Sequence, residues 1–271
     1  MADINKINWF PGHMAKSLRL LDDLKYIDLI IEVVDARAVS SSSNPMLKEK
    51  FGNKPVLTIA LKTDLAIITK PVKNILYGSI YEKKFKNIFL KSIERELQEK
   101  KQRMINKGLV SPTFNLVVVG LPNIGKSSII NFLSGQTKAH AENKPGVTRK
   151  NTLIKINKEL MIYDTPGIMV KNIIDIDVGY RLSLIGVINQ NILPMRDVLE
   201  WWFNFVIVNF PNMLTSVAEN TNGLTFEKYI NLLCEKYSLF KQNNVCDIER
   251  AYTFLYKQII NGALGKINFE L

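Results

Sequence analysis

Residues 120–127 have the types and spacing of a loop that binds phosphate groups. Gly120 is followed by four residues and then by Gly125, Lys126 and Ser127, which fits the pattern G-x-x-x-x-G-K-[ST]. The glycines let backbone N–H groups approach phosphate oxygens closely, at the start of a helix. In such a loop the lysine reaches the β- and γ-phosphates and the serine hydroxyl binds Mg²⁺. We therefore expect a site for a nucleoside triphosphate.

The flanking sequence supplies the context that this loop requires. The apolar run Leu116 to Val119 predicts a buried strand before it, and Ser128 to Leu133 predicts a helix that Gly135 ends. A glycine-rich turn that matches by chance is the alternative, and the flanking elements argue against it. The nucleotide-binding residues expected here are Asn123, Ile124, Gly125, Lys126, Ser127 and Ser128.

A second group of residues suits the metal and the terminal phosphate. Asp164 ends an apolar run and is followed by Thr165-Pro166-Gly167. A carboxylate at a strand end binds Mg²⁺, usually through water, and the N–H of Gly167 is placed to meet the γ-phosphate. Thr148 lies in the polar segment between loop and carboxylate, where its hydroxyl completes the Mg²⁺ shell. An ordinary loop threonine is the alternative for Thr148.

A third group suits a purine base. Lys62, Thr63 and Asp64 follow the apolar run Pro55 to Leu61. An aspartate at a strand end accepts hydrogen bonds from guanine N1 and its 2-amino group, which adenine does not offer, while the Lys62 stem packs along the base. Ser79, at the end of the next expected strand, braces the base edge. A surface K-x-D turn is common by chance, so the preceding strand gives this prediction its weight.

The hydrophobic pattern predicts an α/β domain over residues 1–176 and an all-α domain over 177–271. The expected strands are 28–35, 55–61, 74–80 and 116–119, with a hairpin of 152–156 and 160–163. The expected helices are 45–51, 85–107, 128–133, 177–189, 196–209, 226–238 and 247–261, with one more from Met14 and a serine-rich loop at 36–44.

The charge distribution indicates a polyanionic partner. The net charge of the 271 residues is +11, yet residues 178–271 hold eight basic and eight acidic residues. The whole excess therefore lies in residues 1–177. Within it, Glu82 to Lys107 holds nine basic and four acidic residues. Contact with nucleic acid is one explanation and a solvated helix face is the other.

The remaining composition excludes several classes of protein. Cys234 and Cys246 have neither metal-site nor redox-motif spacing, so we expect reduced thiols in a cytoplasmic protein. The two histidines, His13 and His140, are too few for a histidine-based metal cluster. No apolar run reaches the length of a membrane span, and the N-terminus has no apolar signal core.

The combined motifs resemble those of a known family. The phosphate loop, the PGxT around Thr148, DTPG and K-x-D are similar to GTPase elements G1, G2, G3 and G4, but here G4 and G5 precede G1. This order resembles the circularly permuted GTPases. With the WFPGHMAK of residues 9–16, the DAR of residues 35–37 and Asn44-Pro45, the chain resembles the ribosome biogenesis GTPase A family of the YlqF type, from residue 9 to about residue 185.

That resemblance implies a GTPase switch that acts in late maturation of the large ribosomal subunit. The implied fold is a six-stranded P-loop domain followed by a helical bundle. The implied partners are a large-subunit precursor and its rRNA, bound in the GTP state and released on hydrolysis; GTP or GDP, Mg²⁺ and K⁺ are the implied cofactors, and we expect a monomer. Two alternatives are an RNA-binding assembly scaffold with a degenerate nucleotide site and an ATPase, which Asp64 disfavours.

Four residues bear on how far the resemblance extends to nucleotide affinity, which concerns Leu61, and to catalysis, which concerns the other three. Leu61 stands where the family has Asn, and Ile168 stands where a Ras-like enzyme has its water-orienting Gln. The resemblance offers His13 as a residue that positions water or contacts the γ-phosphate, and a structural turn histidine is the alternative. Asn123 resembles the residue that coordinates K⁺ in potassium-activated GTPases.

Overall fold

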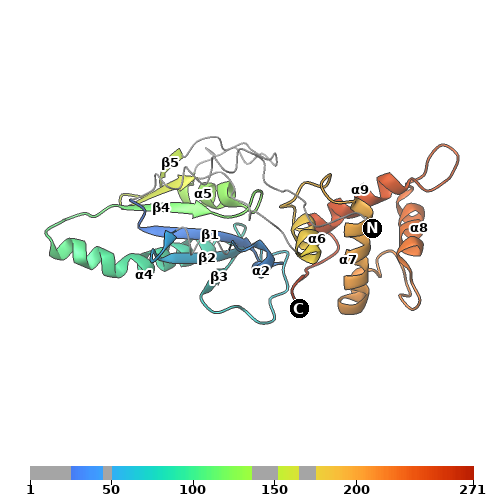
Figure 1. The fold of residues 1–271 in the computed structure, drawn as a ribbon, viewed down its shortest axis with the longest axis horizontal. Helices are drawn as coiled ribbons and strands as arrows, with labels where there is room; N and C mark the ends of the chain where they lie inside the picture. The colour runs from blue at the N-terminus through green and yellow to red at the C-terminus, as the bar shows by residue number, and fades with distance from the viewer. Residues whose placement is uncertain (1–25, 45–50, 136–151, 165–174) are drawn as a thin grey trace.

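The computed structural model describes residues 26–44, 51–135, 152–164 and 175–271. Its first part is a sheet with helices and its second part is helical, as Figure 1 shows from blue to red. The α/β class with a helical C-terminal part, expected from the sequence, is confirmed. Among the described residues, no helix combines the length and apolar character that a bilayer crossing needs.

The sheet contains the six strands expected, in the order β3-β2-β1-β4-β6-β5. Five are parallel, and β5 pairs with β6 as an antiparallel hairpin. Every residue of β1 is buried, which explains its uninterrupted apolar run. The strands are β1 (Leu29–Asp35), β2 (Val56–Leu61), β3 (Ile75–Tyr77), β4 (Phe114–Val119), β5 (Thr152–Lys155) and β6 (Leu160–Asp164).

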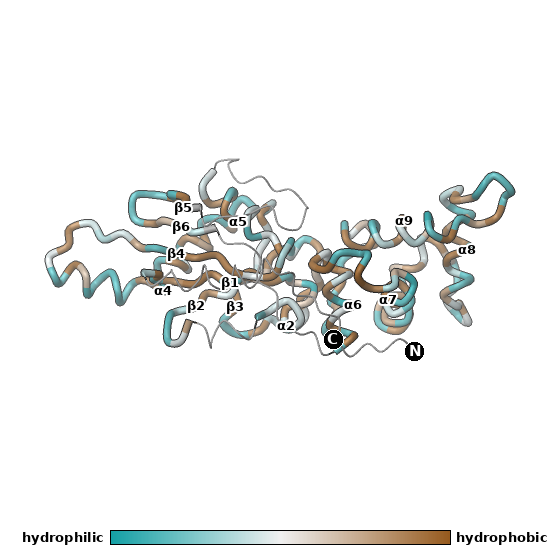
Figure 2. Tube along the Cα trace, turned by 45° about the horizontal axis from the view of Figure 1, so that its top comes forward, coloured by the Kyte–Doolittle hydropathy of each residue, from teal (hydrophilic) through white to brown (hydrophobic). Residues whose placement is uncertain are grey.

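One face of the sheet is covered by α4 (Phe85–Asn106) and α5 (Lys126–Ser134). The buried side chains of α4 recur every fourth residue, at Phe85, Phe89, Ile93 and Leu97, which gives the helix one apolar side. They pack with sheet residues into one large core. Figure 2 shows the result as brown central strands and a mainly teal α4.

The helical part contains α6 (Ile176–Leu184), α7 (Met195–Asn209), η2 (Pro211–Met213), α8 (Phe226–Tyr237) and α9 (Ile248–Ile260). The four α-helices lie where the sequence predicts them, although α6 ends five residues before the predicted Asn189. Side chains of Asp175, Thr225 and Asp247 cap three of them, each accepting a hydrogen bond from an N–H of the first turn.

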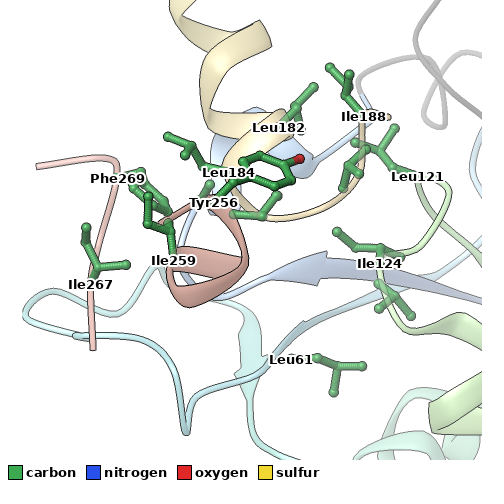
Figure 3. Packing of buried hydrophobic residues seen from close by; sticks show 14 of the residues in the cluster. Leu61, Leu121, Ile124, Leu182, Leu184, Ile188, Tyr256, Ile259, Ile267 and Phe269 are labelled. Atoms are coloured by element: carbon green, nitrogen blue, oxygen red, sulfur yellow. The ribbon is translucent and has the colours of Figure 1, made fainter. Parts of the chain in front are cut away.

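The sheet and the helices share one hydrophobic core. Leu184 of α6 and Ile259 of α9 belong to the same cluster as Leu61 of the sheet, and so do two residues of the C-terminal tail (residues 261–271), Ile267 and Phe269. Figure 3 shows these side chains gathered at the junction. The tail therefore returns from the helical part to the sheet.

Two local predictions differ from the structure. The serine-rich loop of residues 36–44 contains a short helix, α2 (Val39–Ser42), because the Ser42 hydroxyl bonds both to the Ala38 carbonyl oxygen and to the N–H of Asp35. The predicted strand 74–80 is reduced to Ile75–Tyr77, because the chain turns after Gly78 and the N–H of Tyr81 donates to the Ser79 hydroxyl.

The cysteine prediction is wrong for this structure. Cys234 and Cys246, expected as reduced thiols, form a disulfide, with their Cα atoms 5.7 Å apart. An antiparallel bridge between Phe240 and Cys246 folds the segment after α8 back on itself and brings the two cysteines together. Motif spacing does not detect such a pair, because a disulfide requires closeness in space.

Candidate functional site

The site elements share one edge of the sheet. The parallel strands β1, β2, β3, β4 and β6 all present their carboxyl ends there, so the segments that follow them lie side by side. This edge is where ligands bind in open α/β sheets. In Figure 1 the arrowhead of β4 points toward the helical part, so the same edge faces the helices.

The phosphate loop has the backbone that its glycines predict. Gly120 follows β4 with φ +151°, and a Cβ added there would lie 2.6 Å from the backbone oxygen of Val33. Gly125 precedes α5 with φ +114°, and its carbonyl oxygen accepts the N–H of Ile129 to begin the helix. Both positions have a positive φ that strains any residue with a side chain. At Gly120 there is also no room for a side chain, because the loop passes close to the backbone of β1.

Two residues of the phosphate loop, Lys126 and Ile124, are fixed by burial. Lys126 is buried, and its Nζ donates to the carbonyl oxygen of Leu121 at 2.8 Å, so its charge lies across the loop. The side chain of Ile124 is buried and anchors the loop in the core. Asn123 is exposed with φ +57°. Ser127 and Ser128 occupy the first turn of α5. The loop thus presents a cation and a helix N-terminus at one place, which suits phosphate.

The residues predicted to meet a base lie after β2 and β3. Asp64 has a buried carboxylate oxygen, Oδ1, with no hydrogen-bond partner among the residues that the structure describes. A buried carboxylate oxygen normally has a donor, so this atom fits a ligand that brings N–H groups, as guanine does. Lys62 has φ +65°. Thr63 donates from its hydroxyl to Glu82, which ties the loop after β2 to the one after β3.

Ser79 and Leu61 support the base-side loops from within. Ser79 is buried, and its hydroxyl accepts the N–H of Tyr81, so it shapes the turn. Leu61, which replaces the family asparagine, is 3% exposed and belongs to the main core. Its Cδ1 lies 3.4 Å from where a Cβ on Gly125 would be. Leu61 therefore connects, by packing, the segment of residues 62–64 that is predicted to meet the base with the phosphate loop of residues 120–127.

Asp35 and Arg37 are functional candidates to which the residue types alone assigned no role. Asp35, at the end of β1, is fully buried and pairs with Lys62 at 2.8 Å and with Arg37 at 2.9 Å. Burial raises the pKa of Asp35, but the charges and hydrogen bonds of Lys62 and Arg37 outweigh burial and lower the pKa to about 2. The carboxylate is therefore ionised at neutral pH and holds the lysine of the base-side loop.

The other predicted site residues are placed only in part. Asp164 is the last residue of β6, opposite Val118 of β4, but its side chain is outside the description. His13, Thr148 and Gly167 lie outside the described residues, as does Ile168. The Mg²⁺ ligands predicted at Ser127, Thr148 and Asp164 therefore remain predictions. In the part of the chain that the structure describes, three or more His, Cys, Asp or Glu residues nowhere cluster as a metal site would require.

Sequence comparison finds relatives along nearly the whole chain. The family described as "50S ribosome-binding GTPase" matches residues 115–201. The ribosome biogenesis GTPase A of Priestia megaterium is 39% identical, and the alignment covers 97% of this chain and 96% of that protein. The probable ribosome biogenesis GTPase A of Mycoplasma pneumoniae is 37% identical over 98% of this chain and 97% of that protein.

Solved structures show the same fold. GNP-bound YlqF from T. maritima matches with a TM-score of 0.64 and 23% identity, covering 93% of this chain and 96% of that one. A GDP-bound form, TM YlqF, matches with a TM-score of 0.65, also at 23% identity, over 93% of this chain and 98% of that one. At this identity the likeness concerns the fold.

Proposed function

This chain belongs to the ribosome biogenesis GTPase A family, and from that membership we propose that it is a GTP-hydrolysing ribosome assembly factor that acts in late maturation of the large subunit. The observation that carries the nucleotide assignment is the buried, unpartnered Oδ1 of Asp64, at the same sheet edge as the phosphate loop. A single ligand with a guanine base and phosphates would satisfy both features.

Each part of the site has a separate task in this proposal. The N–H groups of the phosphate loop and the Lys126 ammonium group hold the phosphates, and Asp64 accepts hydrogen bonds from the base. Ser127, Thr148 and Asp164 would hold Mg²⁺, which when bound offsets phosphate charge. Gly167 would donate its N–H to the γ-phosphate. Lys62, held by Asp35, packs its stem along the base.

Hydrolysis needs a water-positioning group, and the chain has Ile168 where Ras-like enzymes have Gln. We assign this role to His13, with a structural turn histidine as the alternative. Asn123 is exposed inside the phosphate loop, where a K⁺ ion held by its side chain would add positive charge near the β- and γ-phosphates. The subunit would stimulate turnover by ordering these groups.

The partner is proposed from the names of the relatives and from charge. Those names say "ribosome biogenesis" and "50S ribosome-binding", which suits a large-subunit precursor with its rRNA. We propose that the monomeric protein acts in the cytoplasm and binds this precursor in the GTP state. The GTPase domain would comprise residues 1–176 and the rRNA-contacting helical domain residues 177–271.

The contribution of α4 to phosphate attraction is narrower than its composition indicates. Of its basic side chains, Lys100 pairs with Asp28 and Lys101 pairs with Glu159, so part of their charge is offset within the protein. Lys83 and Lys84, just before the helix, and Lys91 within it are exposed. We therefore assign part of the attraction for RNA to these three lysines.

The phosphate site is tested by Lys126→Ala. Loss of the buried ammonium group should abolish GTP hydrolysis, because the phosphate charge is then uncompensated. Lys155→Ala, which removes an exposed lysine of β5, is the matched control and should hydrolyse GTP at the wild-type rate. Unchanged turnover in a folded Lys126→Ala protein would refute the phosphate site.

The base site is tested by Asp64→Asn. The amide donates where the carboxylate accepted, so the variant should prefer xanthine over guanine nucleotides. Asp197→Asn, an exposed change in α7, should leave the preference unaltered. The preference is measured by competition between GTP and XTP for the protein. An identical preference before and after the change would show that Asp64 does not recognise the base.

An RNA-binding scaffold with a degenerate nucleotide site is the second candidate, suggested by Leu61. Leu61 packs against the phosphate loop, and the Oδ1 atom of Asp64 is still buried and unpartnered among the described residues, which favours a working site. Co-sedimentation with separated ribosomal subunits, in GDP and in a GTP analogue, distinguishes the two. A switch binds the large subunit in a nucleotide-dependent way, and a scaffold binds it equally in both.

A further inference from the structure

The segment that follows Asp64 is paired with the C-terminal tail. The N–H of Ile267 donates to the carbonyl oxygen of Leu65 at 3.1 Å, and the N–H of Ile67 donates to the carbonyl oxygen of Ile267 at 3.2 Å. These two bonds form a parallel bridge between Ala66 and Ile267, and both residues are buried. Asp64 is thus one residue away from a short strand pairing that the helical part supplies.

A close packing contact reinforces this pairing. Gly262, in the turn after α9, has φ +69°, and a Cβ added there would lie 2.6 Å from Cδ2 of Leu65. The turn at Gly262 therefore packs closely against Leu65, the residue after Asp64. Phe269 also anchors the tail, because it is 1% exposed and its N–H donates to the carbonyl oxygen of Arg37.

A second connection, made of charged side chains, joins Lys62, which lies before Asp64, to the helical part. Asp35 holds Lys62, and the same carboxylate holds Arg37. Arg37 in turn donates from Nη1 to the carbonyl oxygen of Ile260 at 3.0 Å and from Nη2 to that of Ile185 at 3.3 Å. These carbonyls lie at the C-terminal ends of α9 and α6, where a cation also meets the negative end of the helix dipole.

Leu65 is therefore bonded directly to the C-terminal tail, and Lys62 is linked to the helical part through Asp35 and Arg37. We propose that the C-terminal segment Ile260–Glu270, acting with Asp35 and Arg37, is a positioning element of the guanine site that sets where the Asp64 carboxylate lies. The inference rests on the proposed GTPase function and extends it. Recognition of a base requires its partner to be held within about 0.5 Å, and this double attachment provides that support.

This proposal couples binding of the base to the position of the C-terminal tail. Such coupling differs from one in which the γ-phosphate controls the helical part. If the tail positions Asp64, a base bound to Asp64 must in turn stabilise the seated tail by the same free energy. GDP and GTP carry the same base, so both nucleotides stabilise the tail equally. A γ-phosphate switch acting through residues 168–177 would instead distinguish the two nucleotides.

The first test compares GDP with IDP, which lacks the 2-amino group that Asp64 reads. The variant Ile267→Pro removes the N–H that bonds to Leu65, and it should lower the ratio of GDP to IDP affinity by about tenfold, the value of one charge-assisted hydrogen bond. A merely structural loss would weaken both nucleotides by the same factor and leave the ratio unchanged. The control Tyr256→Phe removes a hydrogen bond between α9 and Ser183 within the helical part and should keep the wild-type ratio.

The second test needs no variant. Hydrogen exchange at the amides of Ile67 and Ile267 should slow in wild-type protein when GDP is added, and by the same factor with a non-hydrolysable GTP analogue. IDP should give weaker protection. Protection by the GTP analogue alone, or an unaltered GDP to IDP ratio in folded Ile267→Pro, overturns the positioning role while leaving the GTPase assignment intact. Wild-type protein that binds GDP and IDP equally overturns the base assignment itself.

Discussion

Replacement of Asp35 by Asn tests whether the buried charge cluster holds the two parts of the protein together. The carboxylate is fully buried between Lys62 and Arg37, and Arg37 is itself 1% exposed. The variant keeps the size of the side chain but removes its charge. Arg37 then remains buried without its counter-charge, between the carbonyl oxygens of Ile185 and Ile260.

The expected loss of stability follows from two independent routes. The pKa of Asp35 falls from 3.8 to about 2 on folding, and at 1.4 kcal/mol for each unit the ionised group contributes roughly 2–3 kcal/mol at neutral pH. Removal of one partner of a buried ion pair costs about 3–5 kcal/mol. We expect a loss of about 3 kcal/mol in the free energy of unfolding, a large part of the roughly 5–15 kcal/mol of a typical domain.

Urea unfolding, followed by tryptophan fluorescence, to which the buried Trp202 contributes, and by circular dichroism, measures this loss. Glu200→Gln is the control, because Glu200 forms a surface pair with Arg196 at 3.6 Å that is worth about 1 kcal/mol or less. The lowered pKa of Asp35 also predicts the direction in which stability changes with pH. A pKa lowered by folding gives stability that is complete above pH 3.8 and is lost as the pH falls toward 2.

The difference between wild type and Asp35→Asn should therefore shrink between pH 4 and pH 2. A loss below about 1 kcal/mol at pH 7, the size of a surface pair, would refute the reasoning. So would a difference that does not change with pH, because it would indicate altered packing and not a missing charge.

Three further predictions concern the nucleotide and RNA sites. Potassium should accelerate GTP hydrolysis and sodium should not at matched ionic strength, and Asn123→Ala should remove the difference; equal rates in both salts for wild type would contradict a K⁺ site. Gly120→Ala should abolish GTP binding in a titration, because the new methyl would lie 2.6 Å from the Val33 oxygen; wild-type affinity would show that the loop relaxes. Reversal of the exposed Lys83 and Lys84 to Glu should flatten the salt dependence of large-subunit binding, since fewer counterions are released. An unaltered slope in co-sedimentation would place these lysines outside the interface.

The sequence determined the local elements because their signals are local. Buried parallel strands require unbroken apolar runs such as that of β4, and a phosphate loop requires glycine where φ is positive, as at Gly120 and Gly125. The four C-terminal helices follow from helical periodicity, with Pro194, Pro211 and the loop at 220–223 between them. The order of the base-side and phosphate-side motifs along the chain is also a property of the sequence alone.

Only the tertiary structure decided which distant residues meet. The hydrogen bond from Arg37 to Ile260 spans 223 residues and ends on a backbone carbonyl oxygen. Because every residue type has such an oxygen, the sequence pattern does not predict this bond. The pairing of Ile267 beside Ala66 likewise uses backbone groups. The disulfide of Cys234 with Cys246 depends on a turn between them. Sequence motifs predict which residues contact a ligand. Which other residues hold those residues in position depends on the tertiary fold.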